Sequence, residues 1–261
     1  MKVSEKEKAK TRVKILNASV DVIIEKGFKS ASMREIARSA GVGDATIYNY
    51  FPSKEKLLYG YCEYIQQQVM ESLQSIEDFH EYTLHEQLQQ LIDTELEHWL
   101  PAREFLQEVF TLTYHSPTTG STLLGNTRKL NTRMVKDILE AAIEAGEIPD
   151  QPYQDLLPRL FWDYQTGVLA YWLKDDSDGF ANTTQLVDKS MEIITNILHQ
   201  GMIGKSLDLI SFLFRTHVMN TFSSLVTPDH FTDNGDSEEL VKRPFMQSAK
   251  DTKSSKKGRK G

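Results

Sequence analysis

Two short helices joined by a glycine-containing turn are the feature that most constrains the fold of this chain. Ser32 and Glu35 form a capping box, in which the Ser32 hydroxyl accepts the Glu35 amide hydrogen and the Glu35 side chain reaches back to the Ser32 amide. The box predicts a helix over 32–39, which the run Gly41-Val42-Gly43 ends, and a second short helix over 44–50. An apolar helix precedes both, so the pattern predicts a helix-turn-helix unit.

The rest of the chain is also predicted to be helical. Ser53 caps a longer helix, and alternating β-branched runs bounded by tight turns, the signal for strands, do not occur. The spacing of apolar side chains and the positions of Pro and Gly predict further helices near 81–99, 101–115, 119–145, 153–174, 182–200 and 203–225. The fold class is therefore all-α. We expect a three-helix head over 1–60, a larger helical body over 61–226, and a disordered basic tail over 227–261.

Charge is unevenly distributed along the chain. Residues 1–60 hold 12 Lys/Arg and 7 Asp/Glu, residues 61–234 hold 10 and 26, and residues 235–261 hold 8 and 4. The net charge of −7 therefore comes from the middle of the chain, and both ends are basic. A basic head on an acidic body is typical of a DNA-binding domain joined to a domain that stays off the DNA.

The head resembles the TetR family of bacterial transcriptional regulators. The resemblance rests on the runs 32–37, 40–42 and 46–57, with Gly27-Phe28 placed before them, and it covers roughly residues 10–60. It implies a homodimer that binds double-stranded operator DNA with a palindromic sequence, because a short recognition helix contacts few bases and needs a second half-site.

The outward residues of the second short helix are the candidates for DNA contact, with Ile47 facing inward. By resemblance, Thr46, Tyr48 and Lys54 bind backbone phosphates, and Asn49 is the candidate for a base contact because its amide can pair with adenine. The full set of predicted DNA-binding residues is Arg34, Asp44, Ala45, Thr46, Tyr48, Asn49, Tyr50 and Lys54. Two positions depart from the family pattern: Gly43 replaces a Ser cap, and Asp44 stands where Lys is frequent.

The body is predicted to hold the dimer interface and an effector chamber. The helices near 153–174 and 182–200 are apolar on more than one side, and by resemblance they form a four-helix bundle with their twofold mates. The predicted dimer residues are Leu157, Phe161, Tyr164, Val168, Met191, Ile194 and Leu198, and the alternative is that they are core. The predicted ligand residues, again with a core alternative, are Tyr64, His98, Trp99, Phe110 and Tyr114.

The family resemblance implies a repressor that a small hydrophobic effector releases from its operator, with no cofactor. The effector would bind better to a form whose two heads are wrongly spaced for DNA. The alternative function is a TetR-like nucleoid-associated or cell-division regulator whose body binds a protein partner. Metal-ligand spacing, a nucleophile elbow and a phosphate loop are all missing, so we expect neither an enzyme nor a metal protein. The sequence also lacks a signal peptide and a membrane span, which predicts a cytoplasmic protein.

Overall fold

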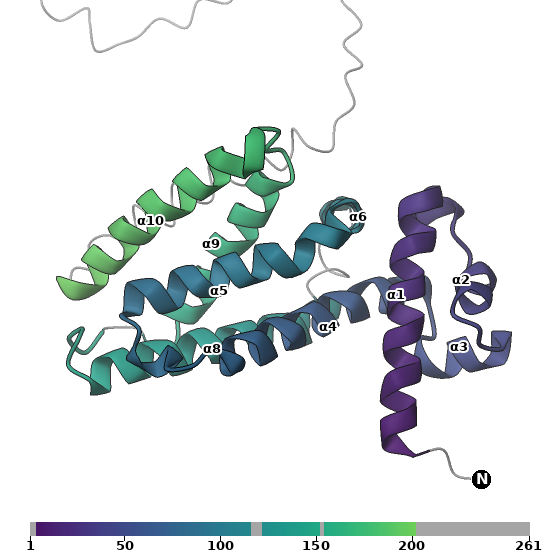
Figure 1. Cartoon of the computed structure of the whole chain (residues 1–261), viewed down its shortest axis with the longest axis horizontal. Helices are drawn as coiled ribbons and strands as arrows, with labels where there is room; N and C mark the ends of the chain where they lie inside the picture. Colours follow the sequence, from purple (N-terminus) through teal and green to yellow (C-terminus); the bar gives the residue numbers. More distant parts are fainter. Residues whose placement is uncertain (1–3, 116–121, 152–153, 202–261) are drawn as a thin grey trace, which may run out of the picture. The chain divides into compact units, whose positions relative to one another are not determined.

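The computed structural model describes residues 4–115, 122–151 and 154–201, and the predicted helix over 203–225 and the predicted tail over 227–261 lie outside these residues. The described chain is all-helical, as predicted (Figure 1). Its α-helices are α1 (Glu5–Ser30), α2 (Met33–Ser39), α3 (Asp44–Tyr50), α4 (Lys54–Ser75), α5 (Leu84–Trp99), α6 (Arg103–His115), α8 (Gly125–Glu144), α9 (Leu157–Trp172) and α10 (Ala181–His199). Short 3-10 turns lie at η1 (Phe79–Glu81), η2 (Leu100–Ala102) and η3 (Asp178–Phe180).

The head consists of α1, α2 and α3, and its local signals are confirmed. Both halves of the capping box at Ser32 and Glu35 are present, and the Ser53 hydroxyl accepts the Lys56 amide at the start of α4. Gly27 interrupts α1 with a φ of 76°, a backbone conformation that glycine adopts without strain. Ile47 is completely buried, so α3 packs by one side and turns its other residues outward.

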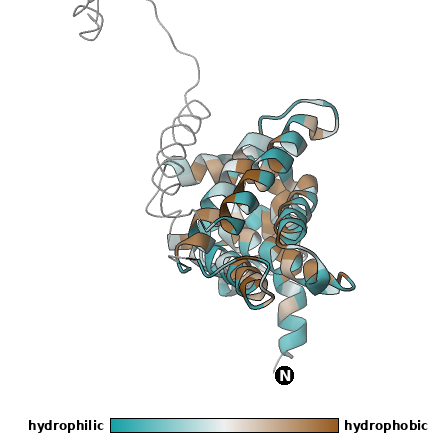
Figure 2. Cartoon of the chain, turned by 90° about the vertical axis from the view of Figure 1, so that its left-hand side faces the viewer, coloured by the Kyte–Doolittle hydropathy of each residue, from teal (hydrophilic) through white to brown (hydrophobic). Residues whose placement is uncertain are grey.

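The body is built from helices that pack on one another in pairs. α4 contacts α5 and α8, α9 contacts α8, and α10 packs against both α5 and α9. Apolar and polar residues alternate along these helices (Figure 2), as expected for amphipathic helices that bury one stripe each. No helix among the described residues has the length and apolar character that crossing a membrane requires.

The observed helix ends differ from the predicted ones by a few residues. The helix expected over 119–145 includes a turn at Leu124, so α8 itself starts at Gly125. The helix expected over 153–174 starts only at Leu157, where Pro158 occupies the first turn. Pro101 lies in the 3-10 turn η2 rather than in α6. In each case the apolar periodicity continues through a turn, so periodicity alone does not show where the helix is interrupted.

Helix α4 joins the head to the body. The predicted division after residue 60 falls inside this continuous helix. Gly60 lets the Phe51 ring approach closely, since a Cβ atom at Gly60 would lie 2.8 Å from the ring. Arg12 of α1 stacks over the same ring at 5.4 Å and lies 3.8 Å from the Glu63 carboxylate. Head and body are therefore packed around the first turns of α4.

Candidate functional site

The outer side of α3 presents the predicted DNA-contacting residues to solvent. The Tyr48 side chain is 53% exposed, and Ala45 and Asn49 are exposed beside it. Thr46 and Tyr50 are half-buried, and the Tyr50 ring packs on the hydrophobic core. The helix has no side-chain cap at Gly43, which confirms the weak capping expected there. A tyrosine and an asparagine held outward on a two-turn helix have the shape and chemistry to enter a DNA groove.

Arg34 and Asp44 form an ion pair that links α2 to α3. The Arg34 Nε atom lies 2.9 Å from the Asp44 Oδ2 atom, and both side chains are largely exposed. A second pair, Lys26 with Glu35 at 2.7 Å, links α1 to α2. The hydrogen bonds from Lys26 and Ser32 lower the pKa of Glu35 to about 2. Asp44 therefore partly neutralises the cation that the sequence predicts for a phosphate or base contact.

Lys54 is engaged inside the protein. Its ammonium group donates hydrogen bonds to the carbonyl oxygens of Phe28, Lys29 and Ala31, and it lies 4.6 Å from the centre of the Phe28 ring. These carbonyls belong to the end of α1, where the helix dipole favours a cation. In this conformation Lys54 fastens α4 to the end of α1, and its predicted phosphate contact stays a prediction.

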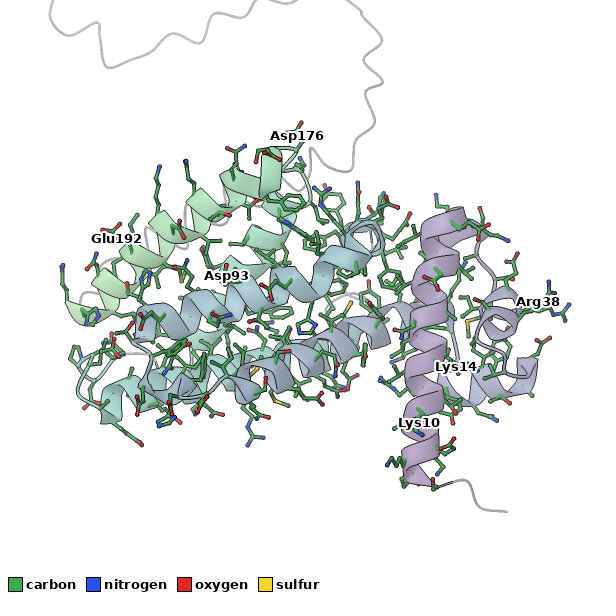
Figure 3. All side chains as sticks on the ribbon, viewed as in Figure 1. Lys10, Lys14, Arg38, Asp93, Asp176 and Glu192 are labelled. Atoms are coloured by element: carbon green, nitrogen blue, oxygen red, sulfur yellow. The ribbon has the colours of Figure 1, made fainter. Side chains whose placement is uncertain are left out.

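The net charges of the two regions of the chain differ in sign. Figure 3 labels Lys10, Lys14 and Arg38 on α1 and α2, whereas Asp93, Glu192 and Asp176 project from α5, α10 and the loop before α10. This agrees with the basic head and acidic body that the sequence indicates. Phosphates of a duplex would be attracted to the head and repelled by the body.

The predicted ligand residues are divided between the interior and the surface. Trp99 is buried, Tyr64 is half-buried, and both rings lie next to Tyr61, at 5.8 Å and 5.9 Å between centroids. His98 is half-buried, and its Nε2 atom lies 2.8 Å from the Ser72 hydroxyl. The remaining predicted residues are Phe110, which is half-buried against the core, and Tyr114, which is exposed.

The interior of the body also contains a polar network that the sequence analysis missed. The Asn131 amide donates to the Gln165 side-chain oxygen at 2.8 Å, and the Gln165 amide donates to the Glu95 carboxyl group. All three side chains are buried, and burial raises the pKa of Glu95 to about 7 despite hydrogen bonds from Gln165 and Trp99. The available signal was the place of Glu95 in the apolar stripe of α5, between Leu91 and Trp99.

The predicted dimer residues are divided between the core and partly exposed positions, and their role in a dimer stays a prediction. Four of them lie inside the core of the chain, which favours the core alternative for them: Phe161, Val168, Met191 and Leu198. Leu157, Tyr164 and Ile194 are half-buried, and the Tyr164 hydroxyl hydrogen-bonds the Ser190 hydroxyl. The outward apolar residues of α9 and α10 are instead Tyr171, Leu186 and Ile193, and Ile193 is 60% exposed. Helices that are apolar on more than one side bury one side within their own chain and expose another.

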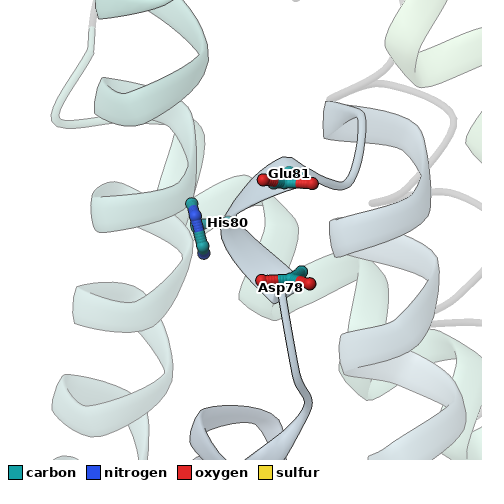
Figure 4. A group of neighbouring side chains, drawn as sticks. All are labelled: Asp78, His80 and Glu81. Atoms are coloured by element: carbon teal, nitrogen blue, oxygen red, sulfur yellow. The ribbon is translucent and has the colours of Figure 1, made fainter.

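Three side chains around η1 could hold a cation. Ligand atoms of Asp78, His80 and Glu81 lie within 4.8 Å of one another (Figure 4). All three side chains are exposed, and exposed acidic groups commonly gather in this way without an ion. We assign no metal to this group.

Comparisons with protein families match both parts of the chain. Residues 15–59 match the family of bacterial regulatory proteins named after TetR, and residues 87–213 match the tetracycline-repressor-like C-terminal domain. The chain belongs to the TetR family of transcriptional regulators. It is a DNA-binding transcriptional regulator with a helix-turn-helix domain and a helical C-terminal domain. Members of the TetR family are regulators, so the prediction that this protein is not an enzyme is confirmed.

Individual members of the TetR family are similar to this chain in sequence or in fold. The regulator UidR of Escherichia coli K12 is 28% identical over 161 residues, which are 61% of this chain and 80% of UidR. The fatty acid metabolism regulator of Bacillus subtilis 168 is 43% identical over 53 residues, or 20% of this chain and 27% of that protein. GusR of Salmonella enterica shares the fold with a TM-score of 0.58 and 22% identity, covering 76% of this chain and 99% of GusR. FadR of Bacillus subtilis, solved with stearoyl-CoA, has a TM-score of 0.54 and 22% identity, covering 72% of this chain and 98% of FadR.

Proposed function

We propose that this TetR-family regulator is a homodimeric repressor that leaves a palindromic operator when a small molecule binds inside its body. The observation that carries the proposal is the continuous α4, because one helix touches both the DNA-binding head and the body interior. A change in the body that tilts α4 would move the head. Two linked heads with altered spacing no longer fit two half-sites of a duplex.

Contacts near the head support this coupling. The Tyr59 hydroxyl of α4 lies 3.0 Å from the Thr113 hydroxyl of α6, and α6 also packs against α1. Two residues further along α4, the Tyr61 ring packs edge-on against Phe105 at 5.0 Å between centroids. A ligand among the aromatic rings would therefore press on α4 and α6, and both of these helices contact α1.

A second copy of the chain is the proposed partner of the outward apolar residues on α9 and α10. We call Tyr171, Leu186, Ile193 and the half-buried Ile197 the α9–α10 face. Leu186, Ile193 and Ile197 follow helical spacing along one side of α10. Apolar side chains that share one exposed side of a helix favour an interaction surface, and a twofold axis would bring the same side of two protomers together.

The proposal predicts where the protein binds in a genome and what releases it. We expect a genome-wide binding map to give one or a few promoters, each with two inverted half-sites protected in a footprint. A small molecule should then lower operator occupancy without separating the dimer. Many scattered sites without a palindrome, together with a protein bound to the body, would instead support the architectural or cell-division role.

Two substitutions on α3 separate phosphate contact from base contact. Tyr48→Ala should weaken binding to every duplex by a similar factor and leave the slope of log K against log salt unchanged, because a neutral hydroxyl that contacts a phosphate releases no counterion. Asn49→Ala should lower operator affinity by about 1–3 kcal/mol and relax the preference at one base position. Titrations of operator and scrambled duplexes at several salt concentrations check both effects. An equal loss on both duplexes for Asn49→Ala would contradict its base contact.

A further inference from the structure

The buried polar side chains of the body carry more hydrogen-bonding capacity than the described chain uses. The Asn131 Oδ1, Gln66 Nε2 and Thr127 Oγ1 atoms are buried and have no hydrogen-bond partner among the described residues. Buried polar atoms are usually paired, because an unpaired one costs about 1–3 kcal/mol. The Asn131 Oδ1 atom can only accept, so its missing partner is a hydrogen-bond donor, and an unpaired acceptor of this kind in a core is a sign of a ligand that donates.

These atoms belong to one region of the body. Asn131 is joined through Gln165 to Glu95, and Thr127 lies one helical turn before Asn131 on the same side of α8. On α4, Cys62 lies near Glu95: burial and the charge of the Glu95 carboxylate both raise the pKa of the Cys62 thiol. Gln66 follows Cys62 by one turn of α4. Helices α4, α5, α8 and α9 thus each direct a neutral amide, a hydroxyl or a carboxyl group toward the same interior.

Aromatic rings continue this region on the side toward the head. Trp99 lies one turn after Glu95 on α5, and the Tyr61 ring packs edge-on against both Trp99 and Phe105. The interior therefore combines a carboxyl group with ring faces. This pairing suits an organic cation, since ring faces attract cations and a buried carboxylate is stabilised by an opposite charge.

The charge balance of the interior favours a cation over an anion. The fully buried polar side chains of the described residues are hydroxyls, amides, Glu95 and Asp175, and none of them is Lys, Arg or His. Asp175 is already satisfied by Ser177 and Thr183, whose hydrogen bonds keep its pKa well below its usual range although burial opposes this. Burial raises the pKa of Glu95, and no ion pair with a cation of the described residues offsets this effect.

We infer that the effector of this regulator is a small organic cation whose hydrogen-bond-donating ammonium group binds Glu95 and the Asn131 carbonyl, with its apolar ring against Tyr61 and Trp99. The inference rests on the proposed effector-responsive function. It names the chemistry of the effector: a protonated amine on a flat apolar body, and neither a carboxylate nor a phosphate. Glu95 acts by direct contact with the ligand, and Gln165 positions its carboxyl group.

Three probes with the same ring test the charge preference in the wild-type full-length protein. They are 2-(1-naphthyl)ethylamine, 2-(1-naphthyl)ethanol and 1-naphthaleneacetate, which end in an ammonium, a hydroxyl and a carboxylate. Calorimetric titration without DNA should give the amine a Kd about tenfold lower than that of the alcohol, and the carboxylate should bind most weakly. Equal or tighter binding of the alcohol or the carboxylate overturns the inference, and so does binding of none of the three.

A pair of variants on α5 assigns the preference to one carboxyl group. Glu95→Gln keeps the size of the side chain, and it should raise the Kd of the amine about tenfold while changing that of the alcohol less than about twofold. Asp93→Asn removes the same charge from a half-buried position of α5 that lies near Asp188, and it should leave both values unchanged. Unchanged amine binding by Glu95→Gln overturns the inference.

The comparison of the three probes uses only the wild-type protein, so it tests the preference for a cation even if Glu95→Gln does not fold. Operator binding is measured separately in a mobility-shift assay. Failure of the dimer to bind a palindromic operator would defeat the proposed function, whereas operator release without preference for amines would defeat only the inference about the effector.

Discussion

Replacing Ile193 with glutamate should convert the protein into a monomer and reduce its affinity for a two-half-site operator about 100-fold or more. The Ile193 side chain is the most exposed of the large apolar residues found outside the core of the described chain. In a twofold interface the substitution occurs twice, so two buried carboxylates would face an apolar surface. Light scattering at micromolar concentration gives the oligomeric state, and a fluorescence-anisotropy titration gives the operator affinity.

Leu100→Glu is the matched control for this prediction. Leu100 is 51% exposed but lies in η2, away from the α9–α10 face in the sequence. This variant should stay dimeric and bind the operator as the wild type does. Binding of a single half-site by Ile193→Glu should be unchanged, since the head is untouched. A dimeric Ile193→Glu protein would show that the dimer uses another surface.

Replacing Lys54 with methionine should destabilise the fold by about 2 kcal/mol, because the ammonium group makes charge-assisted hydrogen bonds to three carbonyl oxygens at the end of α1. Methionine keeps much of the apolar contact with Phe28 but donates no hydrogen bond. The expected fall in Tm is about 4–8 °C for a chain of this size. Thermal and urea unfolding of the full-length protein measure it.

The control for Lys54 is the exposed Lys56, one turn into the same helix. The structure gives no hydrogen bond from its side chain within the described residues, so Lys56→Met should leave the Tm within about 1 °C. The salt dependence of operator binding tests the other role of Lys54. A normal Tm combined with a lower salt slope in Lys54→Met would mean that the lysine leaves α1 to bind phosphate, as the family resemblance implies.

Local signals in the sequence determined the head almost completely. The capping box at Ser32, the glycines after α2 and the cap at Ser53 act within a few residues of themselves, so the bounds of α2 and α3 and the start of α4 could be predicted. Helical period also placed Ile47 inward and Tyr48 and Asn49 outward. The exposed side of α3, which carries the predicted DNA contacts, therefore follows from sequence, because it depends on one helix and its caps.

Tertiary packing decided the rest, because helical period gives the direction of a side chain but not the neighbour that it meets. Met191 and Ile193 are both apolar residues of α10, yet packing buries the first and exposes the second. Lys54 meets carbonyl groups more than twenty positions earlier, and Glu95 meets Gln165, which is 70 positions later. Such contacts depend on how helices from distant parts of the chain cross, so the exposed apolar side chains of α10 and the polar interior became visible only in the folded protein.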